Sequence, residues 1–382
     1  MTNSDVLIIG GGVIGLAIAR ELRLKGVRKI AVLERGAVGR EASHAAAGML
    51  APNAETEKLD EFYRLCDESN RLYPDFAAAL FAETGVDVGF DRQGTLYLAL
   101  TENDSEEIGR RFAWQRGAGL RVERLSAAET RRVEPFLSPD VRESLFFPED
   151  RQVETRRLVA ALERFAALNN IEIRERTSVA RIVFENGRAA GAETEDGEKF
   201  FAGTVVLAAG AWSSQIAAGA LALPAVKPVR GQIVAFQTAK RLFQRVIYSP
   251  RGYLVPRADG RVLAGATSED AGFDKSVTTA AAARLRANAL EIAPSLVNLE
   301  IVEQWAGLRP LAADRRPVLG SFPQVENFLL ATAHFRNGIL LAPVTARIIA
   351  EKIAENRDSD YLRAFGPERF RANDSRSLNI SA

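Results

Sequence analysis

Glycines near the N-terminus show the clearest chemical pattern in the sequence. Gly10, Gly12 and Gly15 follow a β-branched segment at 5–9, and apolar residues at helical spacing come after them. In such a turn the first glycine permits a tight bend, the second lets the backbone approach a pyrophosphate, and the third packs the helix against the strand. The amide groups and the dipole of the helix N-terminus favour phosphate binding. The spacing therefore predicts a dinucleotide site.

An acidic residue closes the same strand–helix–strand unit. Glu34 ends a second buried segment at 29–34, where a carboxylate accepts hydrogen bonds from ribose hydroxyls and repels a 2′-phosphate. Because strand, helix, strand and acid stand in order, we prefer this interpretation to plain glycine turns. The unit alone does not separate NAD from FAD. Its place at the extreme N-terminus, ahead of a small-residue loop at 43–48, favours FAD.

The composition argues against several other functions. The 382 residues include 50 basic and 49 acidic side chains, so no general positive field is available for nucleic acid or a polybasic membrane contact. A single cysteine and two histidines leave no disulfide and little basis for a metal site, so no metal is expected. The N-terminus lacks a secretory signal, and no apolar run is long enough for a transmembrane segment. We expect a cytoplasmic protein.

Isolated residues of reactive types are expected to be structural. Cys66 lies in a helical pattern and is interpreted as an inert core thiol. His44 and His334 are expected to order their loops rather than to ionise, His334 through a backbone bond. The three tryptophans are expected to pack rather than to stack on a ligand. Histidine chemistry therefore does not enter the predicted function.

Strand and helix patterns along the chain predict the elements that position these residues. The turn dipeptides Asn186-Gly187 and Asp196-Gly197 predict two tight hairpins. Residues 135–150 are expected to be irregular. Helices are predicted at about 55–84, 102–134, 155–169, 279–292 and 340–354, and strands at 86–100, 171–174, 204–210, 231–236, 248–256, 261–266, 299–304 and 328–333.

This order of elements predicts an α/β fold. Dinucleotide-type segments occur at the start, the middle and the end, so we expect a FAD-binding Rossmann-like domain interrupted by a mixed α+β substrate domain with an antiparallel sheet. The predicted boundaries are 1–85, 146–220 and 318–366 for the FAD-binding domain, 86–145 and 221–317 for the substrate domain, and 367–382 for a mobile polar tail.

Four further segments carry a family resemblance. They are 45–50 (AAAGML), 206–213 (VLAAGAWS), 305–310 (WAGLRP) and 334–343 (HFRNGILLAP). The chain from residue 4 to 366 resembles the D-amino-acid oxidase superfamily. Within it the chain is most similar to the bacterial glycine oxidases, flavoenzymes that supply the imine of glycine for the thiamine thiazole. The last segment is the most specific and the glycine turn the least.

The resemblance implies non-covalent FAD held by several short segments, because no Cys or His is well placed for covalent attachment. Independently of the family, a helix that opens at 337–338 could stabilise negative charge at N1–C2=O of reduced flavin. The implied contacts are Val13, Ile14, Glu34, Arg35, Ala42, Ser43, Ala47, Gly48, Met49, Val179, His334, Phe335, Arg336, Asn337, Gly338, Ile339 and Leu340.

The resemblance also assigns the substrate residues. Arg309 matches the family's carboxylate-binding arginine, whose planar guanidinium can hold an amino-acid carboxylate through two bonds. Tyr253 matches a tyrosine that donates to the same carboxylate, and Arg336 matches a further residue at the substrate. The simpler alternatives are a weak surface ion pair for Arg309, a strand tyrosine with its hydroxyl in water, and a flavin-side or loop-bracing role for Arg336.

The implied activity is FAD-dependent oxidative deamination of glycine, sarcosine and short D-amino acids to the 2-oxo acid, by hydride transfer to flavin with O₂ reduced to H₂O₂. Such a transfer needs no protein base at Cα, which fits a sequence with almost no histidine. The resemblance implies a homo-oligomer, a tetramer. Ser268 departs from the family, which has a bulky apolar residue there, and this smaller wall predicts room for larger or more polar amines.

Three alternatives remain open from the sequence. A dehydrogenase of the same fold would pass electrons to a quinone or a partner subunit. A non-catalytic flavin-binding subunit would have no need of Arg309 and Tyr253. An NAD-linked dehydrogenase would be colourless.

Overall fold

The sheet that contains the glycine turn is assembled from three separate stretches of the chain. The computed structural model describes residues 2–370. In them the strand order is β17-β18-β11-β1-β2-β8, with the hairpin β9–β10 attached through β11. The run from β18 to β8 is parallel. The bounds are β1 Thr2–Ile9, β2 Ile30–Leu33, β8 Glu172–Arg174, β9 Val179–Glu185, β10 Arg188–Thr194, β11 Lys199–Leu207, β17 Val318–Phe322 and β18 Val325–Thr332.

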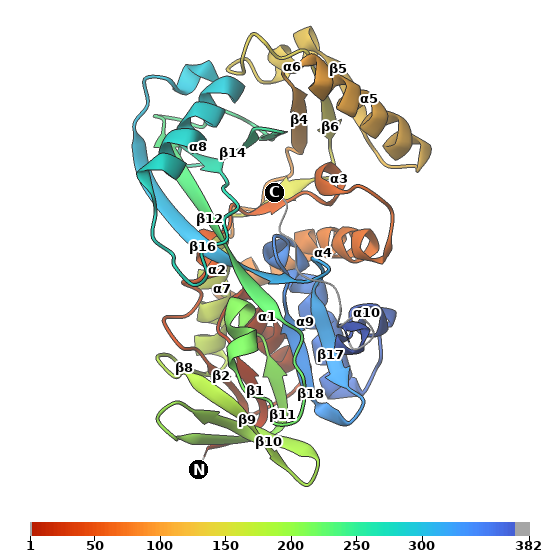
Figure 1. Ribbon diagram of the computed structural model, residues 1–382, viewed down its shortest axis with the longest axis vertical. Helices are drawn as coiled ribbons and strands as arrows, with labels where there is room; N and C mark the ends of the chain where they lie inside the picture. Colours follow the sequence, from red (N-terminus) through yellow and green to blue (C-terminus); the bar gives the residue numbers. More distant parts are fainter. Residues whose placement is uncertain (1, 371–382) are drawn as a thin grey trace.

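Both faces of this first sheet are buried. Ile8 and Val206 pack into a core with helices on one face, whereas their neighbours Leu7 and Val205 pack into a second core beneath the β9–β10 hairpin. Burial on both faces explains the continuous apolar runs in β1 and β11. The helices on the first face are α1 (Val13–Leu24), α4 (Glu61–Thr84), α7 (Thr155–Leu168) and α9 (Gly338–Glu355), seen in the lower half of Figure 1.

A second sheet, largely antiparallel, lies above the first in Figure 1. Its order is β16-β12-β15-β14-β13-β4-β6-β5, and β13–β4 is its parallel pair. Its core joins strand residues to α8 (Thr279–Ile292), and α5 (Glu102–Gly117) and α6 (Ala127–Val133) contact its far strands. The strands are β4 Thr95–Ala99, β5 Glu123–Ser126, β6 Glu143–Phe147, β12 Val226–Gln237, β13 Val246–Ser249, β14 Gly252–Pro256, β15 Arg261–Gly265 and β16 Ile301–Ala312.

Strands β12 and β16 connect the two sheets. They pair from Val226 opposite Ala312 to Phe236 opposite Ile301. Val226 and Ala312 are buried in a core of the first sheet, whereas Phe236 and Ile301 pack in the core of the second. In Figure 1 the two strands run between the upper and lower parts of the molecule. Residues on these strands are therefore fixed relative to both sheets.

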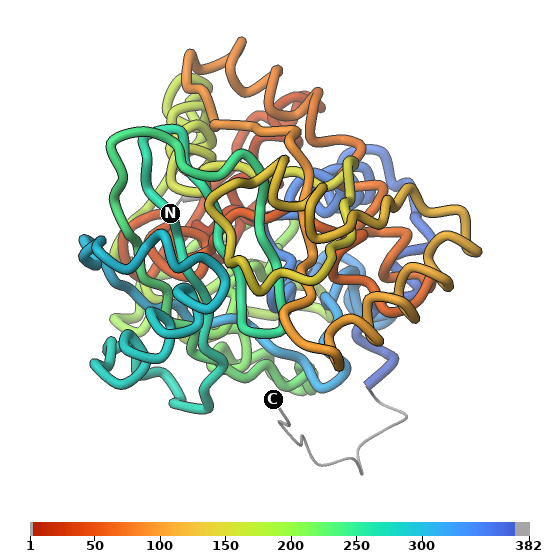
Figure 2. Tube along the Cα trace, turned by 90° about the horizontal axis from the view of Figure 1, so that it is seen from above, coloured from red at the N-terminus to blue at the C-terminus, as the bar shows by residue number. Residues whose placement is uncertain are grey.

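Short elements fill the region between the sheets. They are α2 (Ala42–Ala45), β3 (Met49–Leu50), α3 (Pro52–Glu55), β7 (Arg151–Gln152) and the 3-10 helix Gly210–Gln215. Two further 3-10 helices lie elsewhere: Pro294–Leu296 contacts α8, and Pro367–Phe370 contacts β17. Seen from above, the orange-to-yellow segment and the teal segment of the second sheet lie beside each other (Figure 2). Among residues 2–370, every helix is too short or too polar to cross a lipid bilayer.

The predicted fold class is confirmed, whereas several element bounds are wrong. The stretch at 102–134 is interrupted after α5 and includes strand β5, and 135–150 is not irregular because it contains β6. Both strands depend on antiparallel pairing with a neighbour, β5 on β6 and β6 on β4, which local propensity does not reveal. The strand predicted at 299–304 continues to Ala312. Most of the predicted tail lies outside the described residues, but Arg369, at its start, pairs with Asp314 at 2.8 Å.

Candidate functional site

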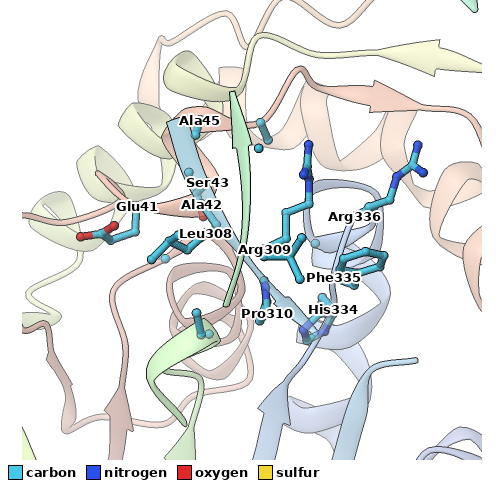
Figure 3. A pocket seen from close by; sticks show the side chains of 18 of the residues that line it. Glu41, Ala42, Ser43, Ala45, Leu308, Arg309, Pro310, His334, Phe335 and Arg336 are labelled. Carbon is cyan, nitrogen blue, oxygen red and sulfur yellow. The ribbon is translucent and has the colours of Figure 1, made fainter. Parts of the chain in front are cut away.

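A cavity of about 700 Å³ lies where the two sheets meet. Its lining runs from Ile9 near the N-terminus to Ile339 in the last long helix, and Figure 3 shows part of it. The predicted site residues that line it are Gly10, Gly12, Val13, Ile14, Glu34, Arg35, Ala42, Ser43, Ala47, Gly48, Met49, Val179, Tyr253, Arg309, His334, Phe335, Arg336, Asn337, Gly338 and Ile339. The structure thus brings together segments that are far apart in the sequence.

Two predicted contacts lie outside this lining. A Cβ on Gly15 would stand 2.0 Å from the carbonyl oxygen of Gly10, so this glycine serves the close packing of helix on strand. Leu340 is buried in the helix core, and its carbonyl accepts a hydrogen bond of 2.6 Å from the Ser69 hydroxyl. Leu340 is therefore a core residue of α9, which the HFRNGIL motif did not reveal.

The turn before α1 is shaped by its glycines and capped by a serine. Gly10 has a φ of +114°, and a Cβ there would stand 2.4 Å from the carbonyl oxygen of Ala208. At the helix start the Val13 amide donates to the Ser43 hydroxyl at 3.0 Å. Ser43 therefore links the predicted phosphate turn to α2.

Glu34 is buried and held in one orientation. Its carboxylate accepts from the amides of Gly11 at 2.8 Å and Gly36 at 2.9 Å. Each oxygen retains a lone pair, which suits two adjacent ribose hydroxyls. Beside it the guanidinium of Arg35 lies 4.1 Å from the ring centroid of Trp212, a residue that also lines the cavity. Trp212 therefore packs against another side chain, in keeping with the expected packing role, and that side chain belongs to a predicted cofactor residue.

Two sets of backbone amides are available to a ligand in the cavity. In the part of the chain that the structure describes, the N–H groups of residues 46–48 have no hydrogen-bond partner, although Ala47 and Gly48 are buried. A second set opens α9, where Gly338 and Ile339 follow the N-cap residue Asn337, which makes no side-chain cap. Buried donors of this kind require acceptors, and the edge of an isoalloxazine ring carries carbonyl oxygens and ring nitrogens. The residues present therefore fit FAD.

His334 is neutral in this environment. It is buried, and burial lowers its pKa to about 3. Its Nε2 atom lies 3.1 Å from the hydroxyl of Thr345. The prediction of a backbone bond is therefore wrong for the His334 side chain, which binds the hydroxyl of Thr345 in α9 instead. His334 braces the loop before α9, and protonation plays no part in that role.

Arg309 lies inside strand β16, not in a loop after it. Its Nη1 atom donates to the carbonyl of Thr267 at 2.9 Å, and burial lowers its pKa. A Cβ on Gly231 would stand 2.2 Å from the same Nη1 atom, so the guanidinium lies directly over that glycine. Among residues 2–370, no carboxylate forms an ion pair within 4.0 Å of Arg309. A half-buried cation without an acidic partner favours an anionic ligand.

Tyr253 is positioned on strand β14 beside this arginine. It is 8% exposed, so its hydroxyl is not simply in water, and burial raises its pKa to about 12. A Cβ on Gly265 would stand 2.4 Å from the hydroxyl oxygen, so this glycine leaves the space that the phenol fills. The phenol therefore remains a hydrogen-bond donor next to Arg309. Gly231 and Gly265 were not singled out from the sequence.

Arg336 is held at the outer end of the cavity. Its Nη2 atom donates to Glu55 at 3.2 Å and to the Tyr248 hydroxyl at 3.1 Å, and the Glu55 carboxylate raises the pKa of Arg336 above its usual range. Tyr248 stacks on Tyr97 with the ring centroids 5.3 Å apart. Figure 3 shows Arg309 and Arg336 extending side by side. Glu55 and Tyr248 had no sequence signal, because one comes from the four-residue helix α3 and the other from the four-residue strand β13, which are far apart in the chain.

The wall next to Thr267 is small and polar. Ser268 lines the cavity and is exposed there. Arg251 also lines the cavity, and its Nη1 atom forms bonds of 2.9 and 2.8 Å to both oxygens of Asp104. Arg251 is thus already neutralised, whereas Arg309 is not. The arrangement presents one free cationic site for a carboxylate within the described residues.

Comparisons with known proteins identify relatives that match nearly the whole chain. The sequence profile of the family described as FAD dependent oxidoreductase matches residues 5–352. The chain is 38% identical over 375 residues to the bifunctional protein ThiO/ThiG of Synechocystis, covering 97% of this chain and 54% of that longer protein. It is 34% identical over 363 residues to the glycine oxidase of Geobacillus kaustophilus, covering 94% and 96% of the two chains. The crystal structure of glycine oxidase from Geobacillus kaustophilus superposes with a TM-score of 0.89 over 100% of both chains.

Proposed function

The chain belongs to the family of FAD dependent oxidoreductases and is an amino-acid oxidase similar to glycine oxidase, and we propose that it deaminates glycine and related small amines. The proposed substrates are glycine, sarcosine and short D-amino acids. The overall reaction converts glycine, O₂ and water into glyoxylate, ammonia and H₂O₂. We further propose that the imine formed first can serve thiamine thiazole synthesis, and that the enzyme is a homo-oligomer in the cytoplasm.

One observation carries the proposed substrate class. Arg309 is a cation in the cavity wall without a carboxylate partner among the described residues, and Tyr253 adds a buried phenolic donor beside it. Two donors of this kind match the two oxygens of an amino-acid carboxylate. A substrate whose carboxylate is held there can place its Cα and its amino group in the rest of the cavity. The proposed substrate class is therefore the α-amino acids.

The side chains orient the substrate and exclude water rather than move protons. Bound FAD supplies the acceptor for the hydride from Cα and returns the electrons to O₂. Transfer from the neutral amine requires no base at Cα, and His334 at neutral charge fits that requirement. The amides of residues 46–48 and the N-terminus of α9 provide donors for negative charge that develops on the acceptor. Catalysis then depends on alignment more than on acid–base groups.

The size of the side-chain wall supports more than one substrate. Ser268 stands where the family resemblance predicts a bulky apolar residue, and it faces the cavity next to Thr267. A substituent on the amine nitrogen or on Cα would meet a short hydroxyl side chain instead of a hydrocarbon wall. We therefore propose that sarcosine and short D-amino acids compete well with glycine.

The test is anaerobic mixing of the purified yellow protein with glycine. Bleaching of the flavin absorption band is the expected result, followed by peroxide formation when air is admitted. A flavin that stays oxidised with glycine, sarcosine and every short D-amino acid would refute the amine oxidation. Turnover only with an artificial dye, and none in air, would instead support a dehydrogenase that passes electrons to a quinone or a partner subunit.

A further inference from the structure

The loop at 45–48, which borders the cavity, has every carbonyl oxygen engaged. The carbonyls of residues 45, 46, 47 and 48 accept, in that order, from the indole of Trp305 at 3.0 Å, the hydroxyl of Thr155 at 3.0 Å, the guanidinium of Arg257 at 2.6 Å and the amide of Val153 at 2.9 Å. The first three donors are side chains from β16, from α7 and from the residue after β14. Such a series is not local secondary structure, because no donor belongs to the loop itself.

Because the peptide group is planar, anchoring a carbonyl also fixes the direction of the next amide N–H. In a trans peptide the C=O of one residue and the N–H of the next point in opposite directions in one plane. Fixing the carbonyls of residues 45–47 therefore fixes the N–H groups of residues 46–48 on the other side. These are the N–H groups that have no partner among the described residues and belong to residues of the cavity wall. The three side chains thus aim three free donors.

Arg257 is the charged member of this set and is almost completely buried. Its side chain is 5% exposed, and burial lowers its pKa. Besides residue 47 it binds the carbonyl of Val153 at 3.0 Å and the side chain of Gln152 at 3.2 Å, and its Nε lies 3.4 Å from Glu154. A buried guanidinium is costly unless its donors are used, and here the two Nη groups hold the loop to residues 152 and 153 at the end of β7. Arg257 does not line the cavity.

The place of Arg257 in the fold links the loop to the substrate side. Strand β14 carries Tyr253, and Arg257 follows directly after its last residue. The backbone that positions the phenol for the substrate carboxylate therefore also positions the guanidinium that holds the loop. A shift of β14 would move both groups together.

We propose that Arg257 is a positioning residue for the flavin: by holding the carbonyl of residue 47, it directs the amide N–H groups of the 45–48 loop at the flavin ring. It acts through the backbone and contacts neither substrate nor cofactor. The inference rests on the proposed function only in assuming that the flavin ring lies beside this loop. The amides stabilise negative charge, so a loop held in place favours the reduced flavin and raises its reduction potential.

The test compares Arg257→Met and Arg257→Lys with the control Arg261→Met. Arg261 contacts the same Glu154 at 2.9 Å but does not reach the loop, so the control removes an arginine from that carboxylate and leaves the carbonyl anchor intact. Each holoprotein is measured for its FAD dissociation constant, its flavin absorption spectrum, its reduction potential, and its kcat and KM for glycine.

The expected result is specific to the flavin. Arg257→Met raises the FAD dissociation constant by about tenfold or more, lowers the reduction potential and lowers kcat with little change in KM, since the lost bond is charge-assisted. Arg257→Lys shows smaller changes in the same direction than Arg257→Met, and Arg261→Met resembles the wild type. If Arg257→Met does not fold, Arg257→Lys decides by the same measurements.

The proposal would be overturned if folded Arg257→Met had the reduction potential, absorption spectrum and FAD affinity of the wild type. If Arg257→Met does not fold, the same result in Arg257→Lys would overturn it. The same effects in Arg261→Met would also overturn it, because the loop anchor would then not be the cause. The outcome is separate from the proposed activity. A wild-type protein that binds FAD but oxidises no amine refutes the activity, yet the potentials of the variants still test Arg257.

Discussion

Gly231, which lies beneath the proposed substrate residue Arg309, gives the sharpest prediction. Gly231 lies on β12, and a Cβ built on it would stand 2.2 Å from Nη1, 2.3 Å from Cζ and 2.3 Å from Nη2 of Arg309. Gly231 has an ordinary strand backbone, so alanine is tolerated by the main chain there. The clash falls on the end of a flexible side chain, which can rotate away at little cost. Gly231→Ala should therefore fold normally and displace the guanidinium.

The magnitude follows from the bonds that the displaced guanidinium loses. To reach ordinary van der Waals contact, the group must move by more than about 1 Å, and a charge-assisted hydrogen bond does not survive such a shift. Loss of bonds to the carboxylate is worth about 3 kcal/mol, which is on the order of a hundredfold in kcat/KM. The melting temperature should remain within a few degrees of the wild type, since no core volume changes.

A double-mutant cycle tests this reasoning directly. Gly231→Ala, Arg309→Ala and the double variant are compared by peroxide-coupled kcat/KM for glycine, with Gly109→Ala as the control because no atom lies within 4 Å of a Cβ there. If the glycine acts only through the arginine, the double variant should be no worse than Arg309→Ala. Full activity in Gly231→Ala, or additive losses in the double variant, would refute the placement of the guanidinium over Gly231.

Three other outcomes follow from the same cavity. Arg309→Ala should lower kcat/KM for glycine about a hundredfold, by roughly 3 kcal/mol, and a change below about threefold would remove Arg309 from the site. Tyr253→Phe should lower kcat/KM for glycine about tenfold, because one hydrogen-bond donor is lost. Since burial raises the pKa of Tyr253 to about 12, the wild-type phenol stays protonated as the pH rises to about 10. A loss of kcat/KM that sets in with rising pH before about pH 10, and that is absent from Tyr253→Phe, would contradict this. Ser268→Met should leave glycine turnover in place and raise the preference for glycine over a short D-amino acid by about tenfold, as measured from the two kcat/KM values; an unchanged ratio would show that Ser268 does not bound the substrate.

Local patterns were sufficient for the parts of the fold that depend on neighbours in sequence. The unit from β1 to β2 carries its own signals, namely apolar runs, spaced glycines and the acid at Glu34. Helix α9 was predicted to within a few residues by its apolar pattern. Strands β5 and β6 were missed because each is stabilised by pairing with a strand that is distant in the chain. The proposed division into domains stays a prediction.

The candidate site shows the same limit at the level of single residues. Motifs pointed to Arg309 and Tyr253, but the space for them comes from Gly231 and Gly265, whose importance depends on strand pairing in the second sheet. Glu55 became visible as a partner of Arg336 only when a four-residue helix was placed opposite the loop before α9. Roles that depend on contacts between segments far apart in the chain leave no periodic signal in one sequence.

The long path of the cavity lining has a consequence for biosynthesis. The lining begins at Ile9 and ends at Ile339, and α1 packs against α9, which is translated more than three hundred residues later. A ribosome that has released only the β1–α1–β2 unit has made the glycine turn without the strand of Arg309 and without the second helix N-terminus. Flavin capture therefore has to wait until α9 has left the ribosome, and tight binding then stabilises only chains that contain this helix. A purified fragment that contains β1, α1 and β2 but lacks α9 should accordingly be colourless.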